Sequence, residues 1–175
     1  MRCGAEPLTA IPDTTNKRGV LINNHYDIVL RELLGDTPWN FATARISYFQ
    51  LGAPLFGFKY SYSTSQDVLR VLEVENVDDY RIEGGKIVTN TSTETLNVKI
   101  ILFSDDPTKY SPSFNTALYL KLAENIAYSL VQSQSLQQSI IAEADRYLRR
   151  ARSYNSQEGV SESRYNEQYT TGIRL

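Results

Sequence analysis

The chain has 175 residues and a formal net charge of −2, which suits one domain with a sizeable core and predicts no overall electrostatic attraction to nucleic acid or membranes. Its hydrophobic content of 41% and aromatic content of 11% argue against disorder along the whole chain, and its single cysteine, Cys3, excludes an internal disulfide framework and a cysteine-based zinc site. No apolar run approaches the ~18 residues of a membrane span, and the first residues lack the apolar core of a signal peptide. We therefore expect a protein that is made and used in a cytoplasm, or in a particle assembled there.

The N-terminal part predicts a loop followed by a helix. Prolines interrupt residues 1–13, and Asp13, Thr14 or Thr15 can cap a helix over 15–34. In that segment apolar residues recur at helical spacing on one face. Gly35 is a suitable residue just beyond the helix end, and Pro38 prevents the helix from resuming.

Residues 39–103 predict an antiparallel sheet. Trp39, Phe41 and Thr43 alternate with smaller or polar residues, although a helix that starts at Pro38 is a real alternative for this piece. Gly84 and Gly85 supply the positive φ angles of a tight hairpin between the segments 80–83 and 86–89. Short connections favour a meander of four or five strands.

The C-terminal part predicts two helices and a tail. Ser111 and Pro112 form an N-cap and first helical position, and the helix over 112–133 repeats apolar residues every four positions. Ser135 and Gln138 have the spacing of a capping box for a helix over 135–154. The short connection predicts an antiparallel helix hairpin. Residues 155–175 lose the apolar period and read as an extended tail that does not fold alone.

Together these elements predict an α+β fold. We expect the N-terminal helix and the C-terminal antiparallel helix hairpin to form a helical bundle, with an inserted antiparallel β-sheet and an extended C-terminal tail. Residues 1–154 would form the domain. The expected structural core residues are Trp39, Phe41, Phe114, Leu118 and Leu122.

Signatures of catalysis are scarce. The only histidine, His25, lies in the first predicted helix without a nucleophile motif nearby, and the acidic pairs at 78–79 and 105–106 lack the spacing of a calcium loop. We predict no catalytic, cofactor or metal site. Arg146, Arg149 and Arg150 fit either a solvated helix end or contact with an acidic partner or DNA.

Eight short segments occur in a recognisable order along the chain. They are GAEPL at 4–8, YDIVLRELL at 26–34, PWNFA at 38–42, YSY at 60–62, DVLRVL at 67–72, YRIEG at 80–84, SPSFNTALYLKLA at 111–123 and ARS at 151–153. In this order they resemble a known family, the head-to-tail adaptor or tail tubular protein A proteins of short-tailed double-stranded DNA phages. The resemblance covers roughly residues 3–158. Two departures are the absence of the family's helix before the first segment and of a proline before Asp67.

The resemblance implies a non-enzymatic structural protein of the virion tail or neck, assembled in the host cytoplasm. Such proteins form a homo-oligomeric, twelvefold ring that binds the portal protein on one side and a nozzle protein, similar to tail tubular protein B, on the other. The ring extends the DNA channel, and double-stranded DNA passes through its lumen. Portal contact would involve the tail residues Tyr165, Tyr169, Ile173, Arg174 and Leu175.

Three other functions stay open at this point. A stopper or neck ring lower in the tail belongs to the same assembly class. A DNA-binding protein would act through Arg146, Arg149 and Arg150. A cell-wall hydrolase is disfavoured by the lone His25 and the lack of a carboxylate motif.

Overall fold

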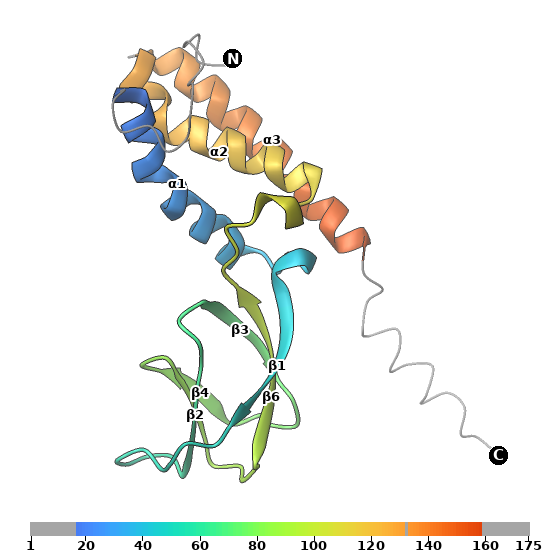
Figure 1. The fold of residues 1–175 in the computed structure, drawn as a ribbon. Helices are drawn as coiled ribbons and strands as arrows, with labels where there is room; N and C mark the ends of the chain where they lie inside the picture. The colour runs from blue at the N-terminus through green and yellow to red at the C-terminus, as the bar shows by residue number, and fades with distance from the viewer. Residues whose placement is uncertain (1–16, 132, 159–175) are drawn as a thin grey trace, which may run out of the picture.

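A computed structural model describes residues 17–131 and 133–158. Figure 1 shows the helices gathered at one end of the molecule and the strands at the other. The elements of the described residues are α1 (Lys17–Asp36), the 3-10 turn η1 (Asn40–Ala42), β1 (Thr43–Phe49), β2 (Tyr60–Ser63), β3 (Val68–Val74), β4 (Tyr80–Glu83), β5 (Lys86–Thr89), β6 (Thr95–Leu102), the 3-10 turn η2 (Pro107–Lys109), α2 (Pro112–Val131) and α3 (Gln134–Gln157).

The strands form two three-stranded antiparallel sheets. Sheet A has the order β1-β6-β3, and sheet B has the order β2-β5-β4. In β6 the buried residues Leu96, Val98 and Ile100 alternate with more exposed ones, and they pack against Tyr62 and Ile87 of sheet B. This alternation follows from the two-residue period of a strand, which turns every second side chain toward the same face. A hydrophobic core therefore lies between the two sheets.

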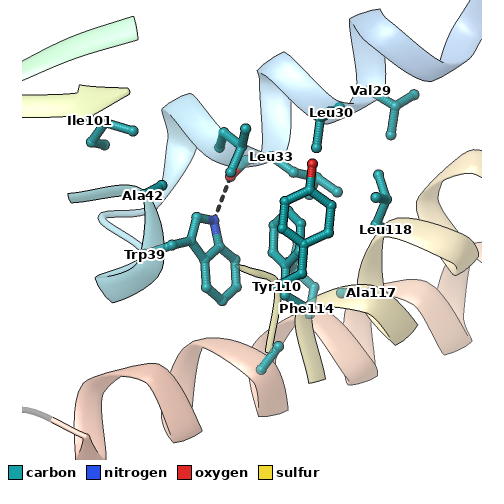
Figure 2. Close-up of a cluster of buried hydrophobic side chains, with 13 residues drawn as sticks. Val29, Leu30, Leu33, Trp39, Ala42, Ile101, Tyr110, Phe114, Ala117 and Leu118 are labelled. Atoms are coloured by element: carbon teal, nitrogen blue, oxygen red, sulfur yellow. Dashed lines mark hydrogen bonds between the residues drawn. The ribbon is translucent and has the colours of Figure 1, made fainter. Parts of the chain in front are cut away.

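The helices and sheet A enclose a second core around Trp39, whose side chain is fully buried. The Trp39 Nε1 donates a hydrogen bond of 2.7 Å to the carbonyl oxygen of Leu33, which ties the ring to the end of α1 (Figure 2). The rings of Trp39 and Phe114 meet edge to face, with centroids 4.9 Å apart. This geometry suits the charge distribution of aromatic rings. Phe114 and Leu118 are also buried, and Phe41 and Leu122 are partly buried against the same cluster.

Two parts of the predicted fold class are wrong: the helices do not form a helical bundle, and the strands do not form a single sheet. In the described residues α2 packs against both α1 and α3, and sheet A closes the core at the end of this helical layer, so the helices do not bury their apolar faces only against one another. The six strands divide between two packed sheets. An α+β composition remains, but the sheets supply the side of the core that a helical bundle would supply itself.

The predicted meander is also wrong. β6 lies between β1 and β3, so strands distant in sequence are neighbours in sheet A. The hairpin prediction is confirmed, because β4 and β5 pair through Gly84 and Gly85 with φ angles of 56° and 73°. Residues 40–42 form a 3-10 turn before β1 rather than strand or α-helix.

The predicted N-cap of α2 is confirmed, whereas the predicted N-cap of α3 is wrong. Phe114 N–H donates to Ser111 Oγ at 3.3 Å, and Pro112 is the first residue of α2, as predicted. The N-cap of α3 is Ser133, whose side chain accepts from Leu136 N–H, and not the predicted Ser135. Moreover, α3 continues to Gln157, past the predicted end at 154.

Candidate partner-binding surfaces

The exposed side of α3 carries three arginines, which we call the arginine face: Arg146, Arg149 and Arg150. Arg146 is 70% exposed and lies 3.9 Å from Glu143, an ion pair at the outer limit of contact. Arg150 donates two hydrogen bonds, of 3.0 and 2.8 Å, to the Tyr154 hydroxyl. Among the described residues, Arg149 has no hydrogen-bond or ion-pair partner. Exposed guanidinium groups with so little local neutralisation suit an acidic partner or a phosphate backbone.

Arg152 belongs to the fold and not to the arginine face. Its guanidinium pairs with Asp36, and its Nε donates to Thr37 Oγ1 at 2.9 Å. Asp36 is the last residue of α1 and Thr37 follows it, so this contact fastens α3 to the segment that leads to Trp39. The ARS motif at 151–153 therefore has a structural explanation, since Ala151 is buried in the same core.

A second surface lies in the connection between β1 and β2, which we call the 50–59 loop. Figure 1 shows it at the end of the molecule far from the helices. Leu55 is fully exposed and Phe56 is 87% exposed, and Leu51 and the preceding Phe49 are exposed as well. Solvent-facing apolar side chains that gather in one place often mark an interaction site.

Sequence reasoning missed this surface because Gly52, Ala53 and Pro54 have the composition of an ordinary turn. A signal was present in the sequence. Leu55 and Phe56 stand among turn-forming Gly52, Pro54 and Gly57, where a chain has no strand or helix face with which to bury them. Apolar residues in such a segment either fold back onto the core or stay exposed, and in this structure Leu55 and Phe56 stay exposed.

The described residues contain no group of three His, Cys, Asp or Glu side chains that could hold a metal ion. His25 lies on α1, half-buried. None of the helices in the described ranges is long and apolar enough to cross a membrane. The tail residues Tyr165, Tyr169, Ile173, Arg174 and Leu175 lie outside the described residues.

No family model matches the chain, and no curated protein is significantly similar to it.

Proposed function

We propose that this chain is a subunit of a ring-shaped adaptor in a phage virion, placed between the portal of the head and the nozzle of the tail. The proposal starts from the short segments that resemble the adaptor family in their order along the chain. In this role the protein catalyses no reaction. It extends the DNA channel from the portal and offers the nozzle a docking face.

The observation that carries the proposal is the separation of two surfaces of different chemistry. The arginine face lies on α3, in the helical layer, whereas the apolar 50–59 loop lies at the far end of the strands. An adaptor has to contact unlike neighbours with different parts of one subunit. Repeating each contact around a ring adds avidity, so no single contact has to be strong.

Electron microscopy of the purified full-length protein tests this proposal directly. The protein is imaged alone, with the portal protein of the same phage, and with the nozzle protein of that phage. We expect rings that stack on the portal and continue its channel. A protein that binds neither portal nor nozzle contradicts the proposal, and one that binds only the nozzle assigns it to a neck ring lower in the tail.

A second candidate function, DNA binding, is favoured by the arginine face alone. Arg149 has no partner within the described residues, and Arg146 and Arg150 retain exposed guanidinium groups. Phosphate contacts of this kind give an affinity that falls steeply with salt. Titration of a short DNA duplex at several salt concentrations distinguishes this function from a ring whose lumen lets DNA slide.

A further inference from the structure

A row of apolar side chains crosses the three strands of sheet B, and the side chain on the edge strand β4 is exposed to solvent. Ile87 on β5 pairs with Tyr62 on β2 and with Ile82 on β4, so these three side chains point to the same face. Tyr62 and Ile87 are fully buried against sheet A, but Ile82 is 53% exposed. The core between the sheets reaches Tyr80 at the start of β4, which is partly buried against it, but it does not cover Ile82. An apolar group placed over Ile82 would extend this core.

The 50–59 loop is held at its base and presents its apolar tip to solvent. Leu51 N–H donates to the Ser61 carbonyl at 2.9 Å, and Ser61 Oγ donates to the Gly52 carbonyl at 2.6 Å. Gln50 also bridges to Tyr62. These contacts fix where the loop leaves sheet B. Leu55 and Phe56 consequently project from a defined site, which lowers the cost of ordering them on a partner.

The loop and Ile82 belong to opposite edges of sheet B. The loop leads into β2, whereas Ile82 lies on β4, and β5 separates these strands. Two strand spacings amount to about 10 Å. The loop leaves sheet B at the β2 edge, and its Leu55 and Phe56 remain exposed instead of covering Ile82 of the same chain. A second copy can supply that cover.

The charges of the two surfaces are complementary. Residues 50–59 contain a single charged side chain, Lys59, which is exposed. Residues 78–83, at and before β4, contain three carboxylates and one arginine. A loop with a positive end and an edge with an acidic end favour one relative orientation and disfavour contact between two identical surfaces.

We propose that the 50–59 loop of one copy packs Leu55 and Phe56 over Ile82 at the β4 edge of the next copy. The inference rests on the proposed ring function and names the surface that builds the ring. Because the loop and the β4 edge are different surfaces, the contact is heterologous, and repeating it generates a closed ring or a filament rather than an isolated two-fold dimer.

Self-association of the full chain tests the contact. Sedimentation over a range of concentrations compares the unmodified chain with a Leu55→Ser, Phe56→Ser double variant and with Ile82→Thr, which retains a strand-forming residue. Each variant should raise the concentration at which half of the chains associate by at least about tenfold. The matched control is Ile28→Ser on α1, where the isoleucine is 62% exposed and lies outside both surfaces. It should associate as the unmodified chain does. Normal association of the loop variant, or a monomeric unmodified chain at all concentrations, overturns the inference.

Disulfide cross-linking tests the direction of the contact. In a Cys3→Ser background, Leu55→Cys and Ile82→Cys are made as two separate proteins. We expect disulfide-linked dimers when the two are mixed and oxidised, and little cross-linking of either alone. Cross-linking of the Leu55→Cys protein with itself would indicate a two-fold contact and overturn the inference.

The two proposals fail in different ways. If the Leu55→Ser, Phe56→Ser variant forms portal-bound rings as well as the unmodified chain does, the adaptor function stands and this contact is wrong. If the chain forms an oligomer that depends on the loop but binds neither portal nor nozzle, this contact stands and the adaptor function is wrong.

Discussion

Asn40 donates two hydrogen bonds of 2.8 Å to Asn155, which lies 115 residues further along the chain. The backbone N–H of Asn40 donates to Asn155 Oδ1, and the Asn40 side chain donates to the Asn155 carbonyl. Asn155 Nδ2 also donates to the Pro38 carbonyl at 3.0 Å. The last turn of α3 is thereby joined to the segment on both sides of Trp39.

Loss of the Asn155 side chain should loosen this junction. We expect Asn155→Ala to lower the free energy of unfolding by about 1–2 kcal/mol, because two side-chain hydrogen bonds to the backbone are removed. Urea unfolding measures the change. Asn115→Ala, at an exposed position of α2, serves as control and should change it by less than about 0.5 kcal/mol. Equal stability of the Asn155 variant and the unmodified chain would contradict the role of this junction.

Trp39 is expected to act on folding and not on partner choice. Trp39→Ala should lower the free energy of unfolding by about 3–5 kcal/mol, since a fully buried ring leaves a cavity. Trp39→Phe keeps an aromatic ring but removes the donor to Leu33, so its smaller loss separates packing from the hydrogen bond. A folded Trp39→Ala protein that has lost only its portal binding would reverse this assignment.

The arginine face predicts how any DNA affinity responds to salt. Changing Arg146, Arg149 and Arg150 together to Gln should reduce the slope of log affinity against log salt by about 2–3, if all three contact phosphates. Fluorescence anisotropy with a short duplex measures the slope. Lys86→Gln, on the hairpin of sheet B, is the control and should leave it nearly unchanged. An unaltered slope in the triple variant would exclude this face as the DNA contact.

Asp106 predicts a dependence of stability on acid pH. Thr108 donates to Asp106 Oδ1 from its hydroxyl at 2.7 Å and from its N–H at 3.0 Å, and these bonds, helped by nearby Lys109, lower the Asp106 pKa. A lowered pKa means that the stabilisation is present above the unfolded value of about 3.9 and is lost as the pH falls through the folded value. The stability difference between the unmodified chain and Asp106→Asn should therefore be present at neutral pH and shrink as the pH falls below about 4. Asp78→Asn controls for the change in net charge, and a difference that grows in acid would contradict the assignment.

Removal of residues 159–175 tests the proposed portal contact. A chain that ends at Glu158 keeps α3 and the Asn155 junction, so its stability should change by less than about 0.5 kcal/mol. Its binding to portal rings should be lost. A full-length chain with Tyr165, Tyr169, Ile173 and Leu175 changed to Ser should lose binding as well, which separates these side chains from chain length. Undiminished assembly of the shortened chain onto portals would contradict the tail's role.

Features that depend on neighbouring residues were predictable from the sequence. The turn at Gly84 and Gly85 needs positive φ angles, and the cap at Ser111 needs only the next few backbone groups. The alternation of Leu96, Val98 and Ile100 likewise follows from the local period of a strand. Of the candidate site, the arginine face was predictable because three arginines share the end of one helix.

The sequence by itself determined the identity of most helices and strands, the hairpin turn and the apolar faces, because these depend on backbone preferences and spacing along a few residues. Only the tertiary structure decided that β6 lies between β1 and β3, that Asn155 binds Asn40, and that Ile82 stays exposed although it pairs with buried Ile87. The order of strands in a sheet and the burial of a side chain depend on which distant segments of the chain meet. An apolar residue in a strand has the same local pattern whether a neighbour covers it or the sheet ends beside it.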